Sequence, residues 1–268
     1  MKADLYYIDI SRSILPNCNK AVALVLGDLH MGSDSFRVRA ATELIQYYVG
    51  KGLQKVILQG DTFEHNNLKK LPKEHGKFLK LLKQIDLEMV WLPGNHDTKL
   101  PELLARFYDE DVMVSNECEF MHDDKLFGVI HGDSFDPVMQ KNGWRGVVWG
   151  ELVEIGTAIH NFVQSFDSRF DSQVAPWLKS LFKKELLKTV KHVRKGATKH
   201  AKHNGLDVVV CGHTHETPKI ISAADNDNIT YINVGCFTEE ECGALLITDE
   251  NYEIVRLITR HKPKVDKK

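Results

Sequence analysis

The chain has 268 residues, of which 43% are hydrophobic and 27% are charged, and its formal net charge at pH 7 is −2. This composition is typical of an ordinary globular protein, and the small net charge indicates no general affinity for nucleic acid or membranes. The length fits one large α/β domain or a core domain with a sizeable insertion. No stretch approaches the length of a membrane span, and the N-terminus lacks the apolar core of a signal peptide, so we expect a cytoplasmic protein.

Short apolar runs rich in Val, Ile and Leu recur along the chain and predict buried β-strands. They are residues 21–27, 54–60, 87–94, 125–131, 206–212, 229–235 and 243–249. Helical segments separate the first runs, and this alternation predicts a layered α/β architecture. The later runs follow one another through short polar loops and indicate antiparallel pairing. We therefore expect an α/β fold in which a mixed β-sandwich is flanked by helices.

Two segments between the early strands have the spacing of amphipathic helices. One apolar face combines Val38, Ala41, Ile45 and Tyr48. The other combines Phe78, Leu81, Leu82 and Ile85. Each helix is therefore expected to cover the sheet with its apolar face.

Residues 137–204 differ from the rest of the chain because they contain no convincing strand pattern. Apolar positions step by three or four residues between 148 and 166 and again between 178 and 197, which predicts two long amphipathic helices. The second carries nine basic residues and the single acid Glu185 between residues 176 and 203. We interpret 137–204 as a helical cap inserted into a core domain formed by 1–136 and 205–268.

Five of the predicted strands end in residues that can bind a metal ion, usually beside a glycine. In chain order these residues are Asp28 and His30 in "GDLH", Asp61 in "GDTFEH", Asn95, His96 and Asp97 in "GNHD", His131 in "HGD", and His213 and His215 in "GHTH". Sites in α/β sheets form outside the carboxyl ends of strands, so we expect these side chains to converge. Imidazole and carboxylate are the usual ligands of hard and borderline cations. On an extended strand end His213 and His215 would project the same way, because residues i and i+2 share a face.

The five segments resemble, in content and order, the motifs of the calcineurin-like metallophosphoesterase superfamily. The resemblance implies two divalent cations bridged by Asp61, with a hydroxide between them that attacks the phosphoester. It places Asp28, His30 and His215 on the first cation, and Asn95, His131 and His213 on the second. It also implies that His96 protonates or stabilises the leaving oxygen while Asp97 orients the His96 ring. Ligands without thiolate suit manganese, with iron and zinc as alternatives.

Within the superfamily, "GDTFE" and the placement of the helical insertion are most similar to the UDP-2,3-diacylglucosamine diphosphatase branch. This similarity implies cleavage of a nucleotide-linked pyrophosphate in an anionic, lipid-linked substrate. It also raises the hypothesis that the basic cap contacts acidic lipid at the inner membrane face, with a solvated lysine face as the alternative. Where that branch commonly has arginine, this chain has His96 and, after "GHTH", Glu216. The substrate and the oligomeric state therefore stay open.

Two other functions are compatible with the same motifs. One is a phosphodiesterase or nuclease whose basic helix tracks a nucleic-acid backbone or which acts on small phosphoesters. The slightly acidic total charge and the lack of aromatic residues between the lysines argue against nucleic acid. The other is a metal-free scaffold, against which the retention of all seven expected ligands argues. Arg37, Arg39 and Arg145 are candidates for binding phosphate oxygens, although each could equally form an ordinary ion pair.

Overall fold

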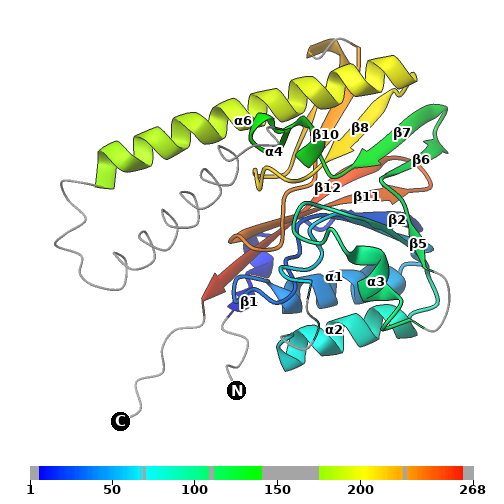
Figure 1. Cartoon of the computed structure of the whole chain (residues 1–268). Helices are drawn as coiled ribbons and strands as arrows, with labels where there is room; N and C mark the ends of the chain where they lie inside the picture. The colour runs from blue at the N-terminus through cyan, green and yellow to red at the C-terminus, as the bar shows by residue number, and fades with distance from the viewer. Residues whose placement is uncertain are drawn as a thin grey trace. The chain divides into compact units, whose positions relative to one another are not determined.

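The computed structural model describes residues 6–66, 68, 71–108, 112–140, 175–225 and 228–261. They form two compact units, the first of which combines Met1–Gly132 with Ala197–Lys268 and contains both β-sheets. The second unit is Asp133–Gly196. Figure 1 shows the sheets of the first unit stacked face to face, with helices covering the outer face of the larger one.

The larger sheet has seven strands in the order β1-β12-β11-β2-β3-β4-β5. Their bounds are Tyr6–Ile8 (β1), Ala21–Leu26 (β2), Lys55–Gln59 (β3), Glu88–Leu92 (β4), Met113–Val114 (β5), Glu241–Thr248 (β11) and Tyr252–His261 (β12). Strands β2, β3, β4 and β5 are parallel to one another. Strand β11 pairs antiparallel with both β2 and β12, and β1 pairs antiparallel with β12.

The smaller sheet has five strands in the order β6-β7-β8-β10-β9. Their bounds are Glu117–His122 (β6), Lys125–Ile130 (β7), Val208–Cys211 (β8), Lys219–Ile221 (β9) and Thr230–Asn233 (β10). The expected antiparallel pairing of the later strands is wrong here, because β7, β8 and β10 are parallel neighbours. The short strand β9 returns the chain between β8 and β10, which lets those two run in the same direction.

Three helices, Val38–Val49 (α1), Lys73–Gln84 (α2) and Leu100–Leu104 (α3), accompany the larger sheet. The predicted apolar face of α1 is confirmed, since its four residues are all buried. In α2 the face is rotated slightly from the prediction: Leu79 is buried where Leu81 was expected. Short 3₁₀ helices occupy Ile10–Arg12, Asp133–Phe135 and Ala223–Asp225.

The central strands β2, β3 and β8 are almost entirely buried, which explains why they are continuous apolar runs. In β2, Leu24 and Leu26 join the core beneath the helices, whereas Ala23 and Val25 join the core between the two sheets. Two cores on the two faces of one sheet confirm the expected β-sandwich flanked by helices.

The second unit contains the short helix Pro137–Gln140 (α4) and most of the long helix Ala175–Asn204 (α6). Gly196 allows Phe135 to approach the backbone of α6, because a Cβ there would lie 2.7 Å from the Phe135 side chain. The predicted helix between 148 and 166 lies outside the described residues, and the predicted helix between 178 and 197 lies within α6. The cap boundaries, 137–204, remain a prediction. Within the part of the chain that the structure describes, no helix is both long and apolar enough to cross a membrane.

Candidate metal centre

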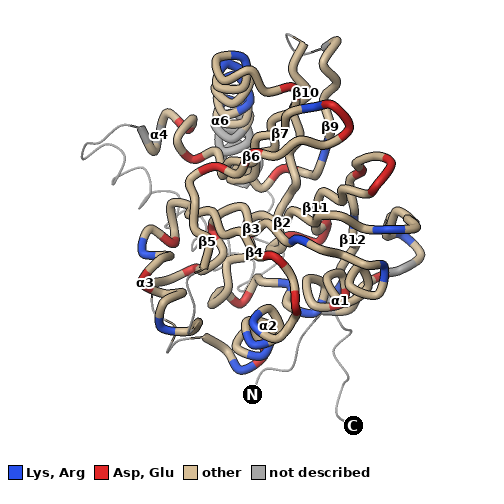
Figure 2. The backbone as a smooth tube through the Cα atoms, turned by 90° about the vertical axis from the view of Figure 1, so that its right-hand side faces the viewer, with Lys and Arg blue, Asp and Glu red and all other residues tan. Residues whose placement is uncertain are grey.

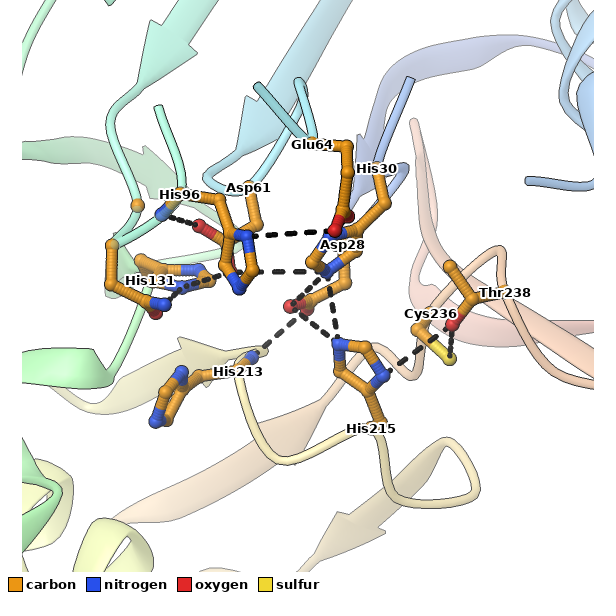
Figure 3. Close-up of polar contacts among 12 residues, drawn as sticks. Asp28, His30, Asp61, Glu64, His96, His131, His213, His215, Cys236 and Thr238 are labelled. Atoms are coloured by element: carbon orange, nitrogen blue, oxygen red, sulfur yellow. Dashed lines mark hydrogen bonds and ion pairs between the residues drawn. The ribbon is translucent and has the colours of Figure 1, made fainter. Parts of the chain in front are cut away.

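Metal-capable side chains from the carboxyl ends of five strands converge at one edge of the sandwich (Figure 3). Asp28, His30 and His215 form one group, which we call the first ligand group. A second ligand group consists of Asp61, His131 and His213. Within each group the ligand atoms lie within 4.8 Å of one another. The loops after β2, β3, β7 and β8 therefore bring together residues that are up to 187 positions apart in the sequence.

The backbone at these residues is in the left-handed region. The φ angles are 51° for Asp28, 50° for His30, 45° for Asp61, 65° for His213 and 47° for His215. Each such conformation costs a residue with a Cβ about 1–2 kcal/mol, so surrounding contacts must hold it. Our expectation that His213 and His215 extend the strand is wrong. The chain turns tightly there, and the Thr214 N–H donates to the Gly212 carbonyl at 2.7 Å.

Main-chain hydrogen bonds between the loops supply that support. The N–H of Asp28 donates to the Gly60 carbonyl at 3.2 Å, and the N–H of His30 donates to the Asp61 carbonyl at 2.9 Å. The N–H of His213 donates to Oδ2 of Asp28 at 2.9 Å. Loops from both sheets are thus fastened to one another, which fixes the directions in which the ligand side chains point.

Motif glycines let the ligands approach this backbone. A Cβ at Gly60, where φ is +85°, would lie 2.5 Å from Cγ of His131. A Cβ at Gly212 would lie 2.5 Å from Oδ2 of Asp28, and one at Gly94 would overlap the Asp61 carboxylate. These glycines are therefore needed for close approach to the ligands as well as for turning the chain.

In the first ligand group, hydrogen bonds direct the lone pairs of two imidazoles toward each other. The Glu64 carboxylate lies 2.6 Å from Nδ1 of His30 and accepts its proton. The Thr238 hydroxyl lies 3.4 Å from Nδ1 of His215 and is oriented to donate to Cys236 Sγ, which leaves Oγ1 as an acceptor. The two Nε2 atoms, 3.2 Å apart, then face each other without a proton. Such an arrangement is suited to a shared cation.

The Asp28 carboxylate adds a negative charge to the same point. Its Oδ1 is buried and lies 3.2 Å from Nε2 of His215. Burial raises the pKa of Asp28, but the hydrogen bond and charge of His215 outweigh burial and lower it overall. Burial lowers the pKa of His215, and the Asp28 carboxylate reverses that effect and raises it. Converging lone pairs and a buried carboxylate are an arrangement that fits a cation.

In the second ligand group, the main chain orients the histidine. Nδ1 of His131 donates to the Gln59 carbonyl at 3.0 Å, so the lone pair of the neutral ring is on Nε2. That Nε2 lies 3.4 Å from Oδ2 of Asp61 and 3.4 Å from Oδ1 of Asn95. The His213 ring lies beside it, with ring centroids 5.2 Å apart. Carboxylate, amide and imidazole ligands of this kind suit a divalent cation.

Asp61 lies between the two groups. Its Oδ2 is 3.8 Å from Nε2 of His30 and 3.4 Å from Nε2 of His131. Its Oδ1 accepts the N–H of His96 at 2.8 Å. Burial raises the pKa of Asp61, yet the hydrogen bond and charge of His131, with the charges of His30 and His96, lower it overall and keep the carboxylate ionised.

The structure assigns Asp97 a different role from the predicted one. Its carboxylate is fully buried and accepts the N–H groups of Gly94 at 2.6 Å, Thr62 at 2.8 Å and Phe63 at 3.4 Å. Those contacts tie the loop after β4 to the loop after β3, so Asp97 organises backbone instead of orienting His96. Burial raises its pKa, and the amide hydrogen bonds act against that rise.

Glu64 lies closer to His96 than the expected partner does. One oxygen of Glu64 is 4.0 Å from Nδ1 of His96 and the other binds His30. The sequence interpretation missed Glu64, Thr238 and the carbonyl of Gln59. The final letter of "GDTFE" was the signal for Glu64, whereas no local pattern marks Thr238 or a main-chain carbonyl.

Two of the three arginine candidates contact protein groups, and the third lies outside the described residues. Arg37 is buried and donates to the carbonyl of Ser35 at 2.8 Å. Arg39 is exposed on α1 and forms an ion pair with Glu43, one turn along the helix. Arg145 lies outside the described residues. Binding of phosphate oxygens by these arginines remains a prediction.

A family model described as calcineurin-like phosphoesterase matches residues 22–217, which include every ligand of both groups. This chain belongs to that family. The phosphoesterase is accordingly a metal-dependent hydrolase of phosphoester bonds, and the side chains of both ligand groups fit divalent metal. No match was found among curated proteins.

Several solved structures are similar to this chain. One, described as a novel archaeal phosphodiesterase, is 16% identical with a TM-score of 0.44, and the alignment covers 87% of this chain and 98% of that chain. A predicted phosphoesterase from Streptococcus pneumoniae is 16% identical with a TM-score of 0.38, covering 91% and 94%. Vacuolar protein sorting 29 from Cryptosporidium parvum is 12% identical with a TM-score of 0.40, covering 92% and 100%. These likenesses are too weak to assign a substrate.

Proposed function

We propose that this phosphoesterase is a two-metal hydrolase that cleaves a nucleotide-linked pyrophosphate of the UDP-2,3-diacylglucosamine type. The position of Asp61 carries the two-metal part of the proposal. One of its carboxylate oxygens faces Nε2 of His30 in the first group and Nε2 of His131 in the second. A single oxygen directed at both groups is the simplest device for holding two cations at a fixed separation.

In this proposal Asp28, His30 and His215 hold the first cation, Asn95, His131 and His213 hold the second, and Asp61 contributes to both. Two divalent cations, manganese first with iron and zinc as alternatives, would offset the negative charge of the phosphoryl group and activate the attacking water. The ligand residues would hold the cations, and the hydrogen bonds between the loops would keep these residues in place.

His96 is proposed to donate a proton to the leaving oxygen. Its backbone N–H is held by Asp61 and its Nδ1 faces Glu64, which leaves Nε2 on the opposite edge of the ring. The side chain is 36% exposed, in contrast to the buried His131, so it is accessible to a substrate. A histidine in this position suits general acid catalysis of leaving-group departure.

The assignment of a pyrophosphate substrate rests on the motif order and on the inserted segment before "GHTH". A second candidate is a phosphodiesterase acting on nucleic acid or small phosphoesters, and the exposed lysines of α6 favour it. These are Lys188, Lys191, Lys195, Lys199 and Lys202 (Figure 2). The same residues support contact with acidic lipid, which for a cytoplasmic protein would be at the inner membrane face. Salt-sensitive co-sedimentation with acidic liposomes tests that contact, and its absence would exclude it.

The deciding experiment counts bound metal per chain and measures manganese-dependent hydrolysis. The substrates are bis(p-nitrophenyl) phosphate, p-nitrophenyl phosphate and a UDP-sugar. The His96→Ala variant should lose about 10²- to 10⁴-fold in kcat on the UDP-sugar, the usual contribution of general acid catalysis. His203→Ala, the same change at an exposed histidine of α6, is the matched control and should match the wild type.

Cleavage of the UDP-sugar at its pyrophosphate bond would support the proposal and lead to acylated UDP-glucosamine as the next substrate. Hydrolysis of the diester alone would favour the second candidate. A chain that binds two cations but hydrolyses none of the three substrates would show that the substrate class is wrong. A chain that binds no metal would leave only the scaffold interpretation.

A further inference from the structure

Gln59 is a buried polar residue at the boundary between the two sheets. It is the last residue of β3, directly before the Gly60–Asp61 motif, and its side chain is 0% exposed. Nε2 of Gln59 donates to the carbonyl of Ile130 at 2.7 Å and to the carbonyl of Val210 at 2.7 Å. Both side-chain protons are therefore used to join the larger sheet to the smaller one.

The two carbonyls lie where β7 and β8 deliver their ligands. Ile130 is the last residue of β7 and immediately precedes His131. Val210 lies in β8, three residues before His213. Elsewhere the facing surfaces of the sheets meet through Val, Ile, Leu, Ala and Phe, which contact one another without fixing a register. A directed amide bond at this edge fixes the two sheets where their positions set the geometry of the ligands.

The main chain of Gln59 adds a third connection. Its carbonyl accepts Nδ1–H of His131 at 3.0 Å and so sets the tautomer of that ring. One residue thus connects the strand that carries Asp61 with the strand that carries His131, by a side-chain bond and a main-chain bond. Through Val210 it also connects with the strand that precedes His213.

The oxygen of the same amide differs from its nitrogen. Oε1 of Gln59 is buried and has no hydrogen bond within the described residues. A buried amide oxygen without a donor costs free energy, whereas the two bonds of Nε2 serve buried carbonyls that an apolar side chain would leave without this donor. Both of those carbonyls lie on the strands that precede His131 and His213, which favours a role in the site.

We propose that Gln59 is a positioning residue that holds the second ligand group in register with Asp61. The inference rests on the proposed function only in treating Asp61, His131 and His213 as metal ligands. Its effect is expected on the second cation, because its side-chain bonds lead to β7 and β8 and its carbonyl accepts from His131.

The test compares Gln59→Met with Gln54→Met, the same change at an exposed glutamine just before the other end of β3. Titration of the metal-free proteins with Mn²⁺ should show about 10- to 100-fold weaker binding of the second cation in Gln59→Met alone, the usual effect of losing an outer-shell contact. The kcat for bis(p-nitrophenyl) phosphate should fall at low Mn²⁺ and recover at high Mn²⁺, with KM unchanged. A merely structural role would lower thermal stability without this recovery.

A second readout needs neither metal nor turnover. The ¹⁵N chemical shifts of the His131 imidazole should report one tautomer in the metal-free wild type and in Gln54→Met, and a mixture in Gln59→Met. Wild-type Mn²⁺ affinity together with a single tautomer in Gln59→Met would overturn the proposal. Failure of the wild type to hydrolyse any substrate would count against the proposed function and leave this result intact.

If Gln59→Met does not fold, two measurements replace it. Gln59→Glu keeps the size of the side chain and removes both donors, so it should show the same loss of the second cation. In the wild type, the side-chain amide protons of Gln59 should exchange with solvent far more slowly than those of Gln54. Fast exchange at Gln59 would show that the bonds to Ile130 and Val210 are not maintained in solution.

Discussion

The two ligand groups are oriented by different kinds of partner. In the first, side chains orient the imidazoles: Glu64 binds His30 and Thr238 binds His215. In the second, the main-chain carbonyl of Gln59 orients His131. A side-chain partner can be replaced by one substitution, whereas a main-chain partner moves only if the strand moves. The orientation of the ligands in the first group can therefore be changed by point mutation, and that in the second depends on the packing of the sheets.

Asp61→Asn should have the largest effect, because Asp61 is the residue that both groups share. The neutral amide lacks the negative charge that the Asp61 carboxylate would offer to both cations. We therefore expect kcat to fall at least about 10³-fold, beyond the range of about 10- to 100-fold for residues that only orient a ligand. Metal analysis should show loss of both cations. Loss of only one would mean that the groups are independent and that Asp61 does not bridge them.

Two alanine substitutions should separate the groups. Gly60→Ala places a Cβ against the His131 ring at a residue with φ of +85°, and Gly212→Ala places one against the Asp28 carboxylate. Displacing a catalytic group by about 1 Å can cost about 10²-fold in rate, so each variant should lose activity on that order. Calorimetric titration should show that Gly60→Ala weakens the second cation and Gly212→Ala the first. The control is Gly76→Ala, where a Cβ meets nothing within 4 Å inside α2, and it should stabilise the protein by about 0.5–1 kcal/mol.

The side-chain partners should give smaller and graded effects. Glu64→Gln keeps an acceptor but removes the charge facing His30, and we expect about 10- to 100-fold weaker binding of the first cation. Thr238→Val removes a longer, neutral contact at 3.4 Å and should cost less. Glu74→Gln on the exposed surface of α2 is the control and should leave metal binding unchanged. Equal effects of Glu64→Gln on both cations would contradict the division into side-chain and main-chain support.

The smallest effect is expected in the acid stability of the metal-free protein. The folded state lowers the pKa of Asp61 below its ordinary value of 3.8, so the ionised carboxylate stabilises the fold. That contribution is complete above the unfolded pKa and is lost as pH falls through the folded one. Urea unfolding should show a difference between wild type and Asp61→Asn that is constant above about pH 5 and shrinks below about pH 4. A difference that grows on acidification would mean that the pKa is raised.

The sequence predicted the strand ends well because the signal is local. Each core strand is a short apolar run followed by a glycine and a ligand-type residue, and parallel strands bring their carboxyl ends to one edge. Asp28, Asp61 and His131 could therefore be placed near one another before any coordinates were known. The apolar face of α1 was predicted equally well, since its four residues at helical spacing are all buried.

Features that depend on distant parts of the chain cannot be predicted from local sequence patterns. Strands β10 and β11 are both apolar runs close together in sequence, yet they belong to different sheets, which only packing decides. The role of Asp97 differs from the prediction because its carboxylate accepts the N–H group of Gly94 in its own loop and those of Thr62 and Phe63 in another. An extended strand end is predicted at His213 instead of a turn, because the left-handed φ is imposed by neighbouring loops and not by a glycine at that position.

The fastening of the loops to one another has a consequence for metal exchange. Asp28, His30 and His213 are held by hydrogen bonds from their own N–H groups to acceptors on the protein. Uptake or release of an ion then does not require the loops to fold or unfold. One preparation of the stripped protein can be loaded with manganese, iron or zinc in turn, and differences in rate among the loaded forms would report the chemistry of the ion rather than a rearranged polypeptide.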